Sequence, residues 1–200
     1  MTHSSYMTER GIWDLNNQKP STVFTASTLD LFSIQELKDH LFYVEDENVS
    51  TVLSMSAGAR DWCQQYVQSD FLTTTRRVRL NYFPNSIQLD YGPFQSITEI
   101  TYTDTDQVSQ TLSTDVYKLN EDTGVITRKY DQSWPDTLSD EDNISIKYVT
   151  GDTDSCLVPG GIKAGVKYLI KALYDNRDGI PEEVEMSVKA LLDPHVRRRL

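Results

Sequence analysis

The chain has 200 residues, 38% apolar and 24% charged, a composition typical of about one globular domain that excludes a collagen-like, coiled-coil or wholly disordered protein. Its net charge of −11 excludes a general nucleic-acid binder, because affinity for a phosphate backbone comes from Lys and Arg. No run of about eighteen apolar residues occurs, so we expect no membrane partner, and residues 1–10 lack the apolar core of a secretion signal.

Residues 1–32 are rich in Ser, Thr and Asn and contain few apolar side chains. Such a segment cannot build a core of its own, so we interpret it as an N-terminal arm that orders only against another surface. A loose tail is the alternative interpretation. The candidates for interface contacts of this arm are Ile12, Trp13 and Phe24.

Two helices are predicted next, over residues 33–44 and 46–68. The first begins with a capping box, in which the Ser33 hydroxyl accepts the Glu36 backbone N–H and the Glu36 side chain reaches back. In the second, apolar residues recur at three- and four-residue spacing, which predicts one buried face. These apolar residues are Val49, Val52, Leu53, Ala59, Cys63, Tyr66 and Val67.

Between residues 71 and 150 the period of the apolar residues changes to two. Val78, Leu80 and Tyr82 alternate with polar residues, as on a half-buried strand. Turn signals separate further short apolar segments, which predicts a block of six or seven strands in an antiparallel sheet or a small sandwich. The further segments cover residues 87–89, 97–103, 116–119, 125–127 and 144–149.

Two more helices are predicted over residues 159–176 and 181–192, and a basic tail follows over residues 194–200. Two helices, a block of strands and two further helices indicate an α+β fold, because the two kinds of element are segregated along the chain. We therefore expect one domain over residues 33–193, with a small four-helix bundle beside a central antiparallel sheet.

The sequence offers no arrangement of side chains for catalysis or for a cofactor. His3, His40 and His195 lie far from one another and from both cysteines, so no metal-ligand spacing is present. Two cysteines are too few for a disulfide scaffold and indicate a reducing compartment. Residues 104–106 begin like a calcium loop, but the later positions do not match, which favours a hairpin turn. We expect no catalytic residue, no cofactor and no metal.

The tail is the one place in the sequence where three basic residues are consecutive. Arg197, Arg198 and Arg199 precede Leu200 in an otherwise acidic chain. Three interpretations stay open: a solvated tail, a plug that inserts into an acidic or carbonyl-rich crevice of a partner, and a contact to DNA. The plug has a specific chemistry, because guanidinium groups pair with carboxylates through two hydrogen bonds.

Several motifs occur in an order that resembles the tailed-phage head–tail connector family, the head-completion adaptors that sit between portal and tail. The resemblance covers about residues 28–192, and its specificity lies in the order and spacing of the motifs. These are SIQELKDHL at 33–41, an acidic turn at 45–47, GPFQSITEITY at 92–102, Tyr117, SWP at 133–135, IKYVTG at 146–151, residues 158–159 and LYDNR at 173–177. Phe42 and Tyr43 stand where the family often has a basic residue.

This resemblance implies a non-enzymatic ring, usually a dodecamer, that stacks on the portal and continues its DNA channel. The implied partners are further copies of the chain, the portal protein, tail or stopper proteins, and the genomic DNA that passes through. The implied location is the neck of the virion, and the host cytoplasm during assembly. We expect Arg197, Arg198, Arg199 and Leu200 to dock on the portal, and acidic side chains of the strand loops or first helices to line the channel.

Three other functions fit parts of the sequence. They are another neck or tail completion protein, a hydrolase that uses clustered carboxylates, and a carbohydrate- or receptor-binding sheet with Trp134 and tyrosines as its platform. The flanking helix pairs argue against the completion proteins, which tend to be smaller or all-β. In any of these classes, an exposed strand edge offers a place for a partner to add a strand.

Overall fold

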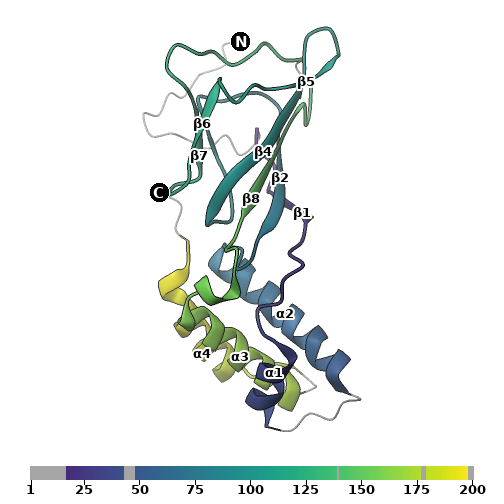
Figure 1. Ribbon diagram of the computed structural model, residues 1–200, viewed down its shortest axis with the longest axis vertical. Helices are drawn as coiled ribbons and strands as arrows, with labels where there is room; N and C mark the ends of the chain where they lie inside the picture. The colour runs from purple at the N-terminus through teal and green to yellow at the C-terminus, as the bar shows by residue number, and fades with distance from the viewer. Residues whose placement is uncertain (1–16, 43–47, 139, 177–178, 198–200) are drawn as a thin grey trace, which may run out of the picture.

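The computed structural model describes residues 17–42, 48–138, 140–176 and 179–197. Figure 1 shows the helices at one end of the long axis and the sheets at the other. Each end has its own cluster of buried apolar side chains, and we call these the helical core and the sheet core. The α+β class predicted from the sequence is confirmed.

Four helices build the helical core: α1 (Ile34–Leu41), α2 (Val49–Val67), α3 (Gly160–Asp175) and α4 (Glu182–Leu192). The capping box of α1 is present, since the Glu36 N–H donates to Ser33 Oγ over 3.2 Å and the Ser33 N–H donates to Glu36 Oε2 over 2.9 Å. In α3, Ile162, Val166 and Leu169 recur on one face and are buried. This face contacts α2 and α4, so α3 lies at the centre of the helical layer.

The prediction of a small four-helix bundle beside the sheet is wrong. Within the described ranges only four α-helices stand against eight strands, so strands dominate the fold. The helices lie at the end of the sheets, and α1 is too short, at eight residues, to run the length of a bundle. The physical reason is that a second sheet already covers the apolar face of the main sheet, which leaves no such face for the helices.

Two antiparallel sheets enclose the sheet core. The five-stranded sheet has the order β1 (Thr22–Thr25), β2 (Thr74–Leu80), β8 (Ile144–Thr150), β4 (Phe94–Thr103) and β5 (Ser109–Thr111). The three-stranded sheet has the order β3 (Ser86–Gln88), β7 (Val125–Arg128) and β6 (Tyr117–Asn120). Ile100 and Ile146 of the first sheet and Ile126 of the second belong to the same buried cluster, so the sheets pack face to face.

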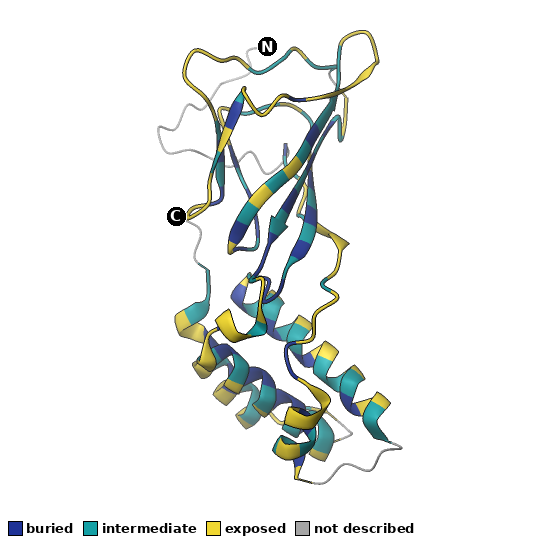
Figure 2. Cartoon of the chain, viewed as in Figure 1, coloured by how far each residue is buried: buried dark blue, intermediate teal, exposed yellow. Residues whose placement is uncertain are grey.

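The central strands follow the predicted two-residue period. In β2 and β8 every second residue is buried, as the alternating colours of these strands in Figure 2 show. Tyr148 points inward, its hydroxyl donates to the Asp90 carbonyl over 2.9 Å, and burial raises the pKa of this phenol. The alternate positions face outward and carry Arg77, Arg79 and Lys147.

Part of the predicted N-terminal arm is ordered against the chain itself. Residues 22–25 form β1, which pairs with β2 at the edge of the five-stranded sheet. Leu31 and Phe32 are buried in the helical core. The segment from residue 17 to residue 32 therefore connects the two cores. Ile12 and Trp13 lie outside the described residues.

Candidate assembly surfaces

Both cysteines and His40 are among the described side chains most capable of chemistry. Cys63 is buried in the helical core, and burial raises the pKa of its thiol to about 12, so it stays protonated at neutral pH. Cys156 is exposed in a short 3-10 turn. The His40 ring lies 2.9 Å from the Lys167 carbonyl oxygen. In the described ranges no three His, Cys, Asp or Glu side chains are grouped to hold a metal ion.

The predicted hairpin turn at residues 104–106 is present between β4 and β5. Asp104 Oδ1 accepts the backbone N–H groups of Asp106 and Val108. A hydrogen bond from Gln110, and then these backbone bonds, lower the pKa of the Asp104 carboxyl.

Among the described residues, the chain has no helix that is both long enough and apolar enough to cross a bilayer.

Trp134 serves as packing for the sheet core. Its ring stacks on Phe83 with a centroid separation of 4.8 Å, and its Nε1–H donates to the Pro84 carbonyl over 2.8 Å. A tryptophan held on one face and at its nitrogen is poorly placed to stack on a sugar, so the structure gives no support to a binding platform at this residue.

A buried polar cluster joins the two cores. The Arg76 guanidinium donates to both carboxylate oxygens of Asp70, from Nε over 2.6 Å and from Nη2 over 2.8 Å. The Thr150 hydroxyl donates to the same carboxylate over 2.5 Å, and the Tyr91 ring lies 3.4 Å from Arg76 Cζ. We call these four residues the junction network. They come from the α2–β2 link, β2, the β3–β4 link and the end of β8, so the network fixes how four segments meet.

Sequence reasoning missed the junction network. Asp70 and Arg76 have side chains only 0% and 6% exposed, which is unusual for charged residues. Nothing in the local pattern marks them, because Arg76 follows the same alternation as its apolar neighbours and Asp70 resembles a turn residue. The backbone of Asp70 is also held, since its N–H donates to the Gly92 carbonyl over 2.9 Å.

Arg197 is half-buried and is held by contacts within the chain. Its backbone N–H donates to the Val67 carbonyl at the end of α2 over 2.9 Å, and Nη2 donates to the Asp122 carbonyl over 3.0 Å. Its guanidinium lies 4.5 Å from the centroid of the Phe94 ring. A Cβ on Gly92 would collide with the guanidinium, so glycine leaves the space that the side chain fills. We call Val67, Gly92, Phe94 and Asp122 the tail seat.

The tail seat changes the expectation for the basic tail. Burial lowers the pKa of Arg197. The Asp122 carbonyl and the face of the Phe94 ring stabilise its positive charge. The Arg197 backbone contacts the helical end of the chain, and its side chain contacts the sheet end. Arg198, Arg199 and Leu200 lie outside the described residues.

Replacing Arg197 by alanine is expected to lower the free energy of unfolding by about 1–2 kcal/mol, because one hydrogen bond and one cation–π contact are lost. Thermal unfolding measures the effect, and Lys118→Ala, which removes an exposed cation from β6, is the control that leaves the melting temperature unchanged. Equal melting temperatures for both variants would show that the seat contributes nothing to stability.

Phe24, the one arm candidate within the described ranges, lies on β1 and is 49% exposed. Its ring centroid is 4.4 Å from Lys147 Nζ and 5.5 Å from Arg77 Cζ, so two cations from neighbouring strands lie against one aromatic face. Both cations belong to the outward face of the five-stranded sheet.

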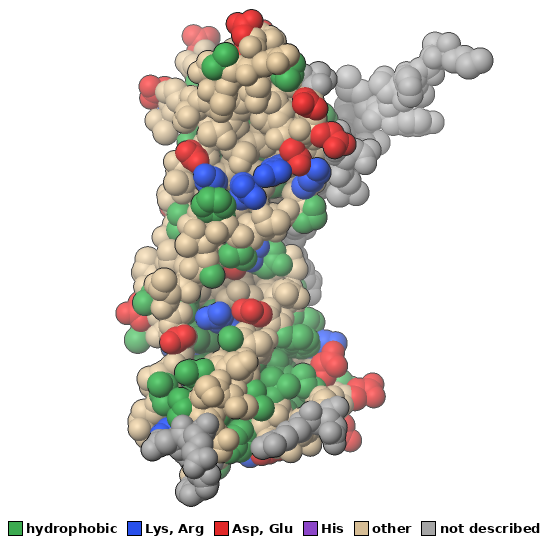
Figure 3. All heavy atoms as spheres, turned by 90° about the vertical axis from the view of Figure 1, so that its right-hand side faces the viewer, with side chains coloured by type: hydrophobic (Ala, Val, Ile, Leu, Met, Phe, Trp, Pro, Cys, Tyr) green, Lys and Arg blue, Asp and Glu red, His purple; other side chains and the backbone are tan. Residues whose placement is uncertain are grey.

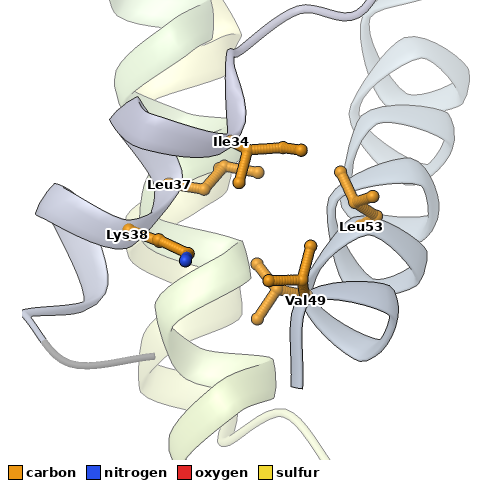
Figure 4. Close-up of a pocket in the computed structure, with 6 residues that line it drawn as sticks. Ile34, Leu37, Lys38, Val49 and Leu53 are labelled. Carbon is orange, nitrogen blue, oxygen red and sulfur yellow. The ribbon is translucent and has the colours of Figure 1, made fainter. Parts of the chain in front are cut away.

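A shallow apolar groove lies between α1 and α2, as Figure 4 shows. Leu37 and Val52 form its buried floor, and Ile34 is 47% exposed at its rim. The remaining lining residues are Lys38, Val49 and Leu53. Among its described lining residues, the groove has no polar side chain except Lys38, which suits it to packing.

Comparisons with known proteins agree on the fold. No protein-family model matches the sequence, and no curated protein matches it. A chain from the neck of an empty gene transfer agent particle, computed with C6 symmetry, superposes with a TM-score of 0.76 at 16% identity, over 91% of this chain and 97% of that one.

Two further structures repeat this likeness. A chain from the virion of the native gene transfer agent particle gives a TM-score of 0.75 at 17% identity, over 90% and 96% of the two chains. A chain from the neck of the native particle, computed with C12 symmetry, gives 0.71 at 15% identity, over 90% and 97%. At these identities the comparisons show a shared fold across nearly the whole of both chains.

Proposed function

We propose that this chain is a structural neck protein of a phage-like particle, a head-completion adaptor that forms a ring between portal and tail. The observation that carries the proposal is a common fold, over nearly the full length of both chains, with chains from C6- and C12-symmetric neck structures. The motif order of the connector family agrees with it. In this role the chain is a spacer and not an enzyme.

The charge of the chain suits a conduit for DNA. With 30 acidic and 19 basic side chains, most of the surface repels phosphates, so a genome passes without being held. A dodecamer is the ring that the connector resemblance implies, and each copy makes heterologous contacts that close by rotation. Such a ring belongs in the virion neck, with assembly in the host cytoplasm.

The last three residues of the tail are the ones that dock on the portal in this proposal. Arg197 is fixed in the tail seat, so the residues left for the portal are Arg198, Arg199 and Leu200. Two arginines suit a carbonyl-rich or acidic crevice. The tail seat then has a positioning role, because it sets the point from which the docking residues emerge.

Negative-stain imaging of the purified chain mixed with purified portal rings of the same particle tests the function. We expect a coaxial ring added to one face of the portal. A chain that stays monomeric and adds no density to the portal would overturn the proposal.

Deleting residues 198–200 is expected to leave the melting temperature unchanged and to weaken binding to portal rings by at least about tenfold, because two charged contacts are lost at the interface. Co-sedimentation with portal rings measures the binding. The truncation stops after Arg197, so the tail seat stays filled. Unchanged binding would refute the docking role of the tail.

A further inference from the structure

Four cations gather on the outward face of the five-stranded sheet. They are Lys19, Arg77, Arg79 and Lys147, and we call them the basic row. Figure 3 shows a row of Lys and Arg side chains across the side of the molecule that carries β1. In a chain of net charge −11, the concentration of positive charge on one face is the feature that requires an explanation.

Two members of the basic row form an electrostatically unfavourable pair within the chain. Arg77 and Lys147 lie directly opposite each other on β2 and β8, and like charges at such positions destabilise a sheet. Lys147 is paired with Glu99 over 2.6 Å, and Asp142 is paired with Lys19 over 2.8 Å and with Arg79 over 3.4 Å. The hydrogen bond from Lys19 holds the pKa of Asp142 below its ordinary value, so this acid stays charged.

The four cations of the basic row therefore form ion pairs with only two carboxylates, those of Glu99 and Asp142. Among the described residues, Arg77 has no carboxylate within ion-pair distance, and its guanidinium lies near the Phe24 ring instead. The row keeps an excess of positive charge that an anionic partner would neutralise.

The edge of the sheet adds apolar surface to this charge. β1 is the terminal strand of the sheet, and all four of its residues are exposed. Phe24 is 49% exposed and its ring lies against Arg77 and Lys147 of the basic row, and Val23, opposite Arg76, is 51% exposed on the same strand. A charged face with exposed apolar residues on a strand that ends the sheet, among the described residues, has the composition of a docking surface rather than of a solvated face.

The outer face of α4 has the complementary composition. Glu182 and Glu183 are exposed in its first turn, and Met186, one helical turn further, is 64% exposed. In Figure 1, α4 lies at the helical end of the molecule, and β1 lies along the right side nearer the sheet end. Two different, complementary faces at separate places on one chain are what a heterologous ring contact needs, since each copy then offers one face to each neighbour.

We infer that the basic row and β1 of one copy bind the outer face of α4 of a second copy, and that this contact closes the ring. The inference rests on the proposed function. The acids of α4 would supply the charge that Arg77 lacks, while Met186 packs on Phe24. Because the two faces lie at different heights along the long axis, neighbouring copies would lean relative to the ring axis.

Zero-length cross-linking of assembled rings tests the contact directly. A carbodiimide joins a lysine to a carboxylate in direct contact, and a mixture of isotopically light and heavy chains separates links between copies from links within one. We expect mixed-isotope links from Lys19 or Lys147 to Glu182 or Glu183. Rings that give mixed-isotope links only elsewhere would overturn the inference.

Charge reversal supplies the second test. The double variant Arg77→Glu, Lys147→Glu is expected to weaken ring assembly on portal rings at least about tenfold, because acidic faces then oppose each other. Adding Glu182→Arg and Glu183→Arg to the same chain is expected to restore it. Lys118→Glu with Arg128→Glu, an equal charge change on the three-stranded sheet, is the control that assembles normally, and thermal unfolding verifies that every variant folds.

The outcomes separate the inference from the proposed function. If the wild-type chain forms rings and the Arg77, Lys147 double variant forms them equally well, the inference fails and the proposed function stands. If the wild-type chain forms no ring on the portal, both fail. If the wild-type chain binds a short duplex DNA and the double variant loses that binding without any change in assembly, the row is a nucleic-acid contact and the inference is overturned.

Discussion

Replacing Asp70 by alanine is expected to lower the free energy of unfolding by about 3–5 kcal/mol. The substitution leaves the Arg76 guanidinium buried, with its Nε and Nη2 donors unpaired, and leaves the Thr150 hydroxyl only the Thr74 carbonyl as an acceptor, over 3.2 Å. A buried charge without a partner is among the few single changes that cost this much. Urea unfolding followed by circular dichroism measures the loss.

Two further variants make this prediction specific. Asp61→Ala removes a carboxylate that is 61% exposed and paired with Arg60 over 3.4 Å, and we expect a change within about 0.5 kcal/mol. Asp70→Leu combined with Arg76→Met removes both charges and is expected to cost less than Asp70→Ala alone. If Asp70→Ala is as harmless as Asp61→Ala, the junction network does not hold the two cores together.

Local sequence signals predicted the elements well where one turn or one strand carries the information. The capping box at Ser33 needs only residues 33–36, and the alternation around Val78 needs only one strand. Helix α3 lies inside its predicted range for the same reason, because Pro159 and the spacing of Ile162 and Val166 define it locally.

Signals that depend on distant parts of the chain were missed. β1 is exposed along its whole length, so its sequence lacks the alternation that reveals a strand, and only its pairing with β2 orders it. The four apolar helix faces indicated burial but not where the helices would pack. That position depends on the three-stranded sheet covering the five-stranded one, which no helix sequence encodes.

The tail shows the same limit for the candidate site. The sequence offered Arg197 as a portal-docking candidate together with Arg198, Arg199 and Leu200, but it did not predict that Arg197 contacts the backbone carbonyls of Val67 and Asp122 and the Phe94 ring. Backbone carbonyls are present at every residue, so no pattern of side chains marks them as acceptors. The basic row was missed for a related reason, because its cations come from strands and a loop far apart in sequence.

Replacing Gly151 by alanine is expected to cost about 3 kcal/mol of stability, the second largest effect that we predict. Gly151 follows β8 with φ +85, a conformation that strains a side-chain-bearing residue, and a Cβ there would collide with the Leu72 carbonyl. The backbone cannot move aside easily, because the Gly151 N–H donates to the Pro93 carbonyl over 2.9 Å and its own carbonyl accepts from Gln95 over 2.5 Å.

Amide hydrogen exchange measures where Gly151→Ala destabilises the chain. Gly151 lies where β8 leaves the sheet core for the helical core, so Gly151→Ala is expected to speed exchange on both sides of the junction, at residues 70–76 and 148–152. Gly58→Ala is the matched control: nothing lies within 4 Å of the new Cβ in the middle of α2, and alanine there is expected to add about 0.5–1 kcal/mol of stability. The two glycine substitutions thus have opposite signs, and a stability gain at both positions would show that the contact between Gly151 and Leu72 does not constrain the junction.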